Sequence, residues 1–296
     1  MDGRSQRTPA ELSGRAASLA SDRRAARTAA RRAKTRRSIA ISTVSTIVVL
    51  GGLTALIVTS PGWPTVRETF FSWPAFKESF PDVLRAFWLD VRMFVIVEVI
   101  VLVLALGIAL CRVTRAPALF PFKLLATVYT DIFRGIPTIL VVYLIGFGVP
   151  ALQLTGVPTD PVVLGCAALS LSYSAYVAEV YRAGIDSVHR SQTAAALSLG
   201  LTGGQAMRFV VLPQAVRRVL PPLLNDFISL QKDVALVSII GPQEAFRVAQ
   251  IYQGQNFNFT PLVAAAALYI AVTFPLARIL DRMQARERRR REAALA

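Results

Sequence analysis

The chain has 296 residues, of which 54% are hydrophobic and only 17% are charged, whereas a soluble domain carries about 25% charged residues. This deficit excludes an ordinary soluble globular protein and indicates an integral membrane protein. The net charge of +15 is concentrated at the ends, because residues 1–37 hold 11 basic and 3 acidic residues and residues 278–296 hold 7 and 3. Membrane topology and anionic lipid explain such tails without a nucleic-acid partner.

Six apolar segments reach or approach the roughly 20 helical residues that are needed to cross a bilayer. They are residues 38–59, 88–111, 119–148, 161–181, 223–241 and 261–280. The sequence therefore predicts an all-α polytopic membrane protein with about six transmembrane helices. The third segment contains Arg134-Gly-Ile-Pro137, so we expect it to bend there.

Basic residues indicate that both termini lie in the cytoplasm, because Lys and Arg are retained on that side of a membrane. With six spans, the polar insert at residues 182–222 then lies in the cytoplasm as well. All three tryptophans, Trp63, Trp73 and Trp88, fall between the first segment and the start of the second, which is typical of the headgroup region and points to residues 60–87 as a surface segment. The four prolines of residues 60–87 predict an outer-surface segment that is divided into short pieces.

The polar insert is expected to begin with a short helix. Ser191 is a suitable N-cap, residues 192–199 are good helix formers, and Gly200 suits the position just after the helix. A helix of two turns is not stable alone in water, so packing must hold it. Its alanines can allow a close approach and Leu197 can enter a groove of a partner; an ordinary surface helix in a loop is the alternative.

The insert resembles the EAA loop of ABC-transporter permease subunits, which docks onto the ATPase. The resemblance rests on three alanines, Gly200 and the ending Val210-Val-Leu-Pro213. It implies that ATPase coupling is carried by Ser191, Ala194, Ala195, Ala196, Leu197, Gly200, Leu212 and Pro213. The glutamate that names the loop would fall at Ala194, where it could close a capping box with Ser191, so its absence leaves docking to packing and other residues.

Four further motifs are similar to the polar-amino-acid uptake branch of these permeases. They are Asp131–Pro137, Ala175–Arg182, Leu212–Arg218 and Asn225–Asp233. The likeness implies a permease domain at residues 82–282, preceded by a basic disordered cytoplasmic tail (1–37) and by an additional transmembrane helix with an outer-surface segment (38–81). A basic cytoplasmic tail (283–296) follows.

The resemblance also implies the rest of the machine. The sequence contains no Gly-x-x-x-x-Gly-Lys-Ser/Thr loop, so ATP hydrolysis is expected from two separate ABC ATPase subunits that bind ATP and Mg²⁺. A second permease subunit, identical or related, and an extracytoplasmic solute-binding protein are the other expected partners. The chain is then a non-enzymatic importer subunit of the bacterial cytoplasmic (inner) membrane, which moves a polar or charged amino acid by alternating access and holds no cofactor of its own.

Charged residues inside the apolar segments are candidates for the translocation path, because a charge in the bilayer usually faces the protein interior or a cavity. The candidates are Glu98, Arg134, Lys232 and Asp233. Glu98 can receive a cationic group of the substrate, or it can bond to a neighbouring helix. Lys232 and Asp233 are adjacent and do not share a helix face, so each needs its own partner; Arg134 is expected to hold the bend.

Other functions find less support in the sequence. Cys111 and Cys166 form no Cys-x-x-Cys motif and His189 has no metal-ligand partner at a useful spacing, so no metal site is expected. No catalytic constellation of the kind that an intramembrane enzyme needs is present. A stand-alone, ion-coupled amino acid carrier remains the alternative, although the inverted repeats typical of such carriers are not evident.

Overall fold

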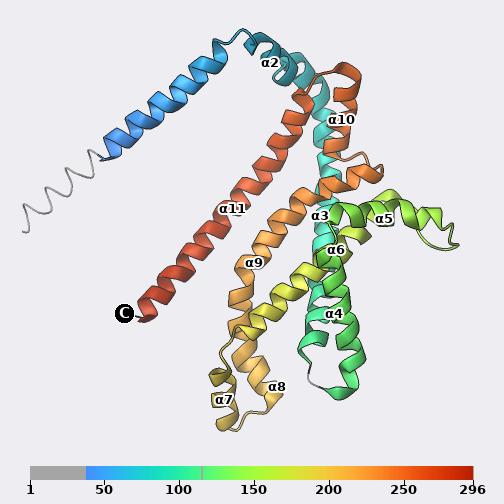
Figure 1. The fold of residues 1–296 in the computed structure, drawn as a ribbon, viewed down its shortest axis with the longest axis vertical. Coiled ribbons are helices and arrows are strands. Elements are labelled where there is room, and N and C mark those ends of the chain that lie inside the picture. Colours follow the sequence, from blue (N-terminus) through green and yellow to red (C-terminus); the bar gives the residue numbers. More distant parts are fainter. Residues whose placement is uncertain (1–37, 115, 296) are drawn as a thin grey trace, which may run out of the picture. The chain divides into compact units, whose positions relative to one another are not determined.

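The computed structural model describes residues 38–114 and 116–295, with side chains described up to residue 286. All regular elements in this part of the chain are helical, which confirms the predicted all-α class (Figure 1). Their order is a helix at Ser38–Val58, α2 (Trp63–Phe70), α3 (Trp73–Val113), η1 (Pro117–Leu119), α4 (Phe120–Gly135), α5 (Thr138–Ala151), α6 (Pro161–Asp186), α7 (Arg190–Ser198), α8 (Gly203–Ala206), η2 (Met207–Val211), α9 (Leu212–Asp233), η3 (Val234–Ile240), α10 (Ala245–Asn256) and α11 (Thr260–Leu295). The tail predicted at residues 1–37 lies outside the described residues.

Two compact units make up the chain, with the division after Val66. The first unit contains the helix Ser38–Val58, and every residue of this helix is exposed. A helix that is apolar on all sides suits a lipid environment. The second unit, which starts at Arg67, contains all the candidate functional residues and is described from here on.

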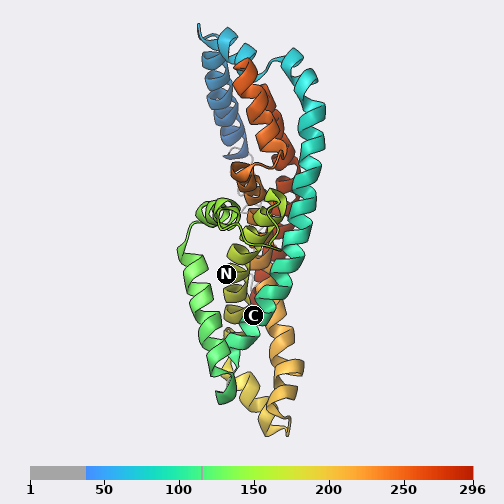
Figure 2. The ribbon, with the colours of Figure 1, turned by 90° about the vertical axis from the view of Figure 1, so that its right-hand side faces the viewer.

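Four helical stretches of the described chain are long and apolar enough to cross a membrane, and a bent pair raises the number to five. The bent pair is α4 and α5, whose axes differ by 104°; Figure 2 shows α5 turning away from α4. The predicted bend is therefore confirmed. α4 ends at Gly135 because Pro137 disfavours helical geometry at the preceding residue and lacks an N–H.

The prediction of a single span at residues 223–241 is wrong. This segment is divided between the end of α9 and the 3₁₀ helix η3, and it does not qualify as a span among the described helices. The cause is visible in the sequence, because Asp226, Lys232 and Asp233 carry charges and the polar run from Gln231 to Asp233 interrupts the apolar pattern just before η3.

We expected residues 60–87 to be divided into short pieces, and this prediction is correct only for the first part of the segment. α2 is short, but α3 begins after the N-cap Ser72 and continues through Pro81 to Val113 without a break. Tertiary packing overrides the proline, because Val83 and Phe87 of α3 are buried against α10 and α11 in a separate hydrophobic cluster. This packing compensates for the hydrogen bond that Pro81 cannot donate.

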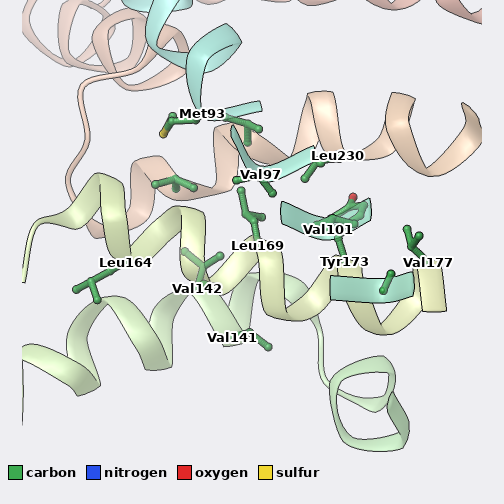
Figure 3. Close-up of a cluster of buried hydrophobic side chains, with 14 of the residues drawn as sticks. Met93, Val97, Val101, Val141, Val142, Leu164, Leu169, Tyr173, Val177 and Leu230 are labelled. Atoms are coloured by element: carbon green, nitrogen blue, oxygen red, sulfur yellow. The ribbon is translucent and has the colours of Figure 1, made fainter. Parts of the chain in front are cut away.

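The main core forms where α6 packs against α3. Buried residues recur every four positions on α3, at Met93, Val97, Val101, Ala105 and Ala109, so they form one continuous stripe. This stripe faces buried residues of α6, with α5 and η3 completing the cluster (Figure 3). α6 is therefore the central helix of the unit.

Two glycines allow η3 to lie directly against its neighbours. A Cβ atom on Gly165 of α6 would come within 2.2 Å of the Cγ1 atom of Val237, and one on Gly146 of α5 would come within 2.3 Å of the Cγ2 atom of Ile240. Because protein interiors are close-packed, neither position has room for a methyl group. The 3₁₀ helix is held by these two close contacts.

We expect Gly165→Ala to destabilise the protein by about 1–3 kcal/mol, because the new methyl group must displace Val237 in a filled core. The matched control is Gly107→Ala on α3, where an added Cβ meets nothing within 4 Å. Thermal unfolding of both variants in the same detergent measures the effect. Equal melting temperatures for the two variants would show that η3 is not held by close packing.

Candidate functional site

The insert helix α7 begins two residues earlier than predicted. Its N-cap is His189, whose Nδ1 atom accepts a hydrogen bond of 3.2 Å from the backbone N–H of Ser191. Ser191 is therefore inside the first turn, and its hydroxyl pairs with the same ring nitrogen at 2.6 Å. The predicted cap at Ser191 is wrong because the histidine ring competes successfully for the free N–H groups at the helix start.

The earlier start of α7 also changes the position of Ala194 within the helix. With His189 as the cap, the third helical position is Gln192, so a glutamate at position 194 could not close a capping box. A complete capping box occurs instead at the start of α8, where the side chain of Thr202 accepts from the N–H of Gln205 and the side chain of Gln205 accepts from the N–H of Thr202.

Gly200 ends α7 as predicted. Its φ is +84°, in the left-handed region that favours glycine. The N–H of Gly200 donates to the carbonyl of Leu197 at 3.0 Å, and the N–H of Leu201 donates to the carbonyl of Ala196 at 3.2 Å. These two bonds form a Schellman motif, which satisfies carbonyl groups that the helix itself leaves free.

One face of α7 is available to a partner. Ala196 is buried, whereas Ala194 and Ala195 are exposed and Leu197 and Leu199 are 48% and 82% exposed. We call these four exposed residues the insert surface. Figure 1 shows α7 and α8 together at the tip of the connection between α6 and α9. Two large apolar side chains exposed on a short polar helix are typical of a docking surface.

The base of the insert is attached firmly to α6 and α9. Arg218 of α9 donates from its Nη1 atom to the carbonyl oxygen of Ser187, just after α6. Gly184 of α6 lies so close to Val219 of α9 that a Cβ would be only 2.0 Å from the Cγ2 atom. Pro213 lies in the first turn of α9, where its fixed φ suits a helix start. These contacts join α6 and α9 to each other at the base of the insert.

A second cluster joins three helices through Glu179 of α6. Its Oε2 atom lies 2.7 Å from the Nη1 atom of Arg112 at the end of α3 and 3.7 Å from the Nη1 atom of Arg134 at the end of α4. Its Oε1 atom pairs with Arg182, which also pairs with Asp186 at 2.7 Å. We call these five residues the Glu179 cluster.

Arg134 therefore holds the bend through α6, as part of the Glu179 cluster. The hydroxyl of Tyr176 also donates to the backbone carbonyl of Arg134 at 3.2 Å. One helix end is thus fixed by its side chain and by its backbone. The expectation that Arg134 lies at the bend is consistent with this geometry, and the path role of Arg134 stays a prediction.

The other path candidates lie on α3 (Glu98) and at the end of α9 (Lys232 and Asp233). Glu98 of α3 is half-buried and lies within electrostatic range of Asp226 of α9. Asp233 accepts a hydrogen bond of 2.7 Å from the hydroxyl of Tyr173 of α6, whereas Lys232 is exposed. We call Glu98, Asp226 and Asp233 the acidic seam. The structure does not bring Arg134 into it.

Sequence reasoning missed several members of these clusters. Asp226 was available as an acid inside a predicted span, and its Oδ2 atom is buried without a partner among the described residues. Arg112 was not among the candidate residues, although it is the most buried arginine of the Glu179 cluster, with 11% of its side chain exposed. Tyr173 gave no signal, because a tyrosine in an apolar segment is usually a core residue.

Comparison with known proteins identifies the family. The model of the family described as binding-protein-dependent transport system inner membrane component matches residues 116–290. The chain is 33% identical over 197 residues to the arginine transport system permease protein ArtQ of Bacillus subtilis (strain 168), covering 66% of this chain and 88% of that protein. It is 36% identical over 180 residues to the putative glutamine transport system permease protein GlnP of Rickettsia felis, covering 60% of this chain and 80% of the relative.

Solved structures agree with this result. A crystal structure of an amino acid ABC transporter with histidines matches with a TM-score of 0.66 and 32% sequence identity, covering 72% of this chain and 98% of the other. An inward-facing structure of the MetNI methionine ABC transporter matches with a TM-score of 0.55 at 19% identity, covering 69% and 95% of the two chains. The second likeness supports the fold alone.

We expect Glu179→Gln to lower the melting temperature by on the order of 5 °C, because it leaves Arg112 and its neighbours partly buried without a counter-charge. The control is Asp186→Asn, whose side chain is 57% exposed and pairs only with Arg182; exposed pairs contribute little. Thermal unfolding of the purified variants in one detergent checks this. A loss no larger than that of the control would contradict a structural role of the cluster.

Proposed function

The chain belongs to the binding-protein-dependent transport system inner membrane component family, and on this premise we propose that it is the permease subunit of an ATP-driven importer for a polar or charged amino acid. Its place is the bacterial cytoplasmic membrane, with both termini in the cytoplasm. The observation that carries the proposal is the insert surface, an exposed apolar face on a short helix that is attached firmly to two long helices.

The proposal divides the work between subunits. Two ABC ATPase subunits bind ATP with Mg²⁺ and dock on the insert surface. A second permease subunit, identical or related, completes the path, and an extracytoplasmic solute-binding protein delivers the substrate. The absence of a phosphate-binding loop in the sequence supports this division, because the backbone cradle of such a loop is what holds the nucleotide.

Alternating access then follows from the contacts of the insert. When the ATPase subunits approach each other, α7 moves with them, and the contacts of Ser187 with Arg218 and of Gly184 with Val219 carry the displacement into α6 and α9. From α6 it reaches α3 and α4 through the Glu179 cluster. Packed helices move as near-rigid bodies, so a small shift at the insert reorients the whole bundle.

The acidic seam is the part of the path that we assign to substrate recognition. It lies between α3, α9 and α6, and its carboxylates favour a cationic group over an anionic one. The relatives are named for arginine and for glutamine, so both a charged and a neutral polar substrate fit the family. A stand-alone carrier is not favoured, because nothing in its mechanism requires the insert surface.

Gly200→Ala is expected to reduce ATPase recruitment by about tenfold, because an L-residue in the left-handed region costs about 1–2 kcal/mol and loosens the end of α7. The matched control, Gly204→Ala, adds the same methyl group at a position with ordinary φ and open space. Co-purification of the ATPase subunit and ATP hydrolysis by the complex measure the effect. ATP turnover by the purified permease alone, or full recruitment by Gly200→Ala, would refute the proposed docking.

Glu98→Gln is expected to lower the uptake of arginine or lysine by on the order of tenfold relative to glutamine, because one negative charge leaves the seam. Uptake of labelled amino acids into proteoliposomes that contain the complete importer measures this ratio. Asp82→Asn, an exposed acid on the same helix, serves as the control. An equal fall for all substrates would assign Glu98 to helix packing instead of to the path.

A further inference from the structure

Two buried acids meet at the start of α10, away from the insert and from the acidic seam. Asp90 of α3 is 3% exposed, and Glu244, the N-cap of α10, is completely buried. Glu244 accepts hydrogen bonds from the N–H groups of Phe246 at 2.8 Å and Arg247 at 2.6 Å. Asp90 accepts one from the N–H of Ala245 at 3.2 Å. Both acids therefore bind the same helix start.

The two carboxyl groups also lie against the same hydroxyl group. The hydroxyl of Tyr269 of α11 lies 3.0 Å from the Oδ2 atom of Asp90 and 3.4 Å from the Oε2 atom of Glu244. The Oδ1 atom of Asp90 is buried and has no hydrogen-bond partner among the described residues. A carboxylate can only accept, so two neighbouring carboxyl groups can bond to each other only when one of them carries a proton.

No cation neutralises this pair within the described part of the chain. Neither acid forms an ion pair there; the Nη1 atom of Arg247 of α10 donates instead to the Oε1 atom of Gln250 at 2.7 Å. From α9, Lys232 is exposed and the carboxyl group of Asp233 accepts from Tyr173. The residues that η3 contributes, Val234–Ile240, include no titratable side chain.

The surroundings of the pair are apolar. Asp90 borders a cavity of about 380 Å³ between α3, α9 and α11, which is lined mainly by apolar residues such as Phe87, Phe94 and Phe227. The other polar residue of this lining, Gln231, already accepts a hydrogen bond of 2.7 Å from Thr273. Two negative charges in contact cannot both form readily in such a setting.

We propose that Asp90 and Glu244 are a proton-binding site, and that one proton shared between them fastens the start of α10 to α3 and α11. Tyr269 and the N–H groups of residues 245–247 stabilise the single remaining negative charge. Behind this junction, Ala245 and Ala249 pack against Val83 and Phe87. Loss of the proton leaves two buried charges in contact, and separation of α10 from α3 relieves their repulsion.

The shared proton determines how the stability of the junction between α10 and α3 depends on pH. The closed junction holds one more proton than the separated acids, so its stability is greatest at low pH and falls as the pH rises. The start of α10 then opens more often, and its backbone N–H groups exchange with solvent more rapidly. Because this readout involves no transport, it can fail while the proposed importer function stands, and the reverse also holds.

Asp90→Asn is the decisive variant. The asparagine Oδ1 atom can still accept from Ala245 and Tyr269, while its NH₂ group donates to Glu244 in place of the shared proton. The control is Asp82→Asn on the same helix, an exposed acid that pairs only with Arg85. Hydrogen exchange of residues 245–252, corrected for intrinsic rates, is measured on the full chain in nanodiscs.

Between about pH 6 and about pH 9, the protection of residues 245–252 is expected to fall at least about tenfold in the wild type and in Asp82→Asn, and by less than about twofold in Asp90→Asn. Glu244→Gln also removes the shared proton, and its protection is likewise expected to be independent of pH. If Asp90→Asn does not fold, Glu244→Gln tests the proposal in its place. A wild-type profile that is flat, or one that either variant reproduces in full, overturns the proposal.

Discussion

α6 carries small residues wherever a neighbouring helix approaches it most closely, and the rest of the unit depends on this close approach. Gly165 receives Val237 of η3 and Gly184 receives Val219 of α9. Between these positions, Ala168, Ala175 and Ala178 are fully buried. In lipid, helices gain little from burying apolar surface and associate mainly through tight packing of this kind. The polar contacts of the site can form only because the backbones are already near each other.

Close packing at α6 also explains why its polar side chains can act together. Tyr173, Tyr176 and Glu179 recur at steps of three residues, so they lie along one side of the helix. They contact α9, the end of α4 and the end of α3 in turn. α6 therefore contacts three other helices through a single row of polar side chains.

Features that depend on local chemistry could be predicted from the sequence. The bend at Pro137 and the left-handed Gly200 follow from the conformational limits of proline and glycine, and both are present. The cap of α7 was missed because Ser191 and His189 can both accept from the free N–H groups, and propensity alone favours serine. Pro81 was overestimated as a helix breaker because the packing of Val83 and Phe87 against other helices is not visible in a local pattern.

The candidate site could be predicted only one residue at a time. Glu98 and Asp233 stood out as acids in apolar segments, but their neighbours Asp226 and Tyr173 come from other helices and were not identified. Pairings of this kind depend on the rotation of each helix about its axis, which a sequence pattern leaves open. Polar contacts between helices set this rotation, which the periodicity of the apolar residues does not determine.

α3 illustrates this last point. Two of its polar residues, Asp90 and Arg112, are separated by about 33 Å along the helix axis, and each contacts a different partner: Asp90 the start of α10 and Arg112 α6. An apolar helix without them could slide or rotate against its neighbours at little cost. Because each contact is satisfied at only one rotation and one height, together they define a single packing of the helix, and transport requires that the bundle move between defined packings.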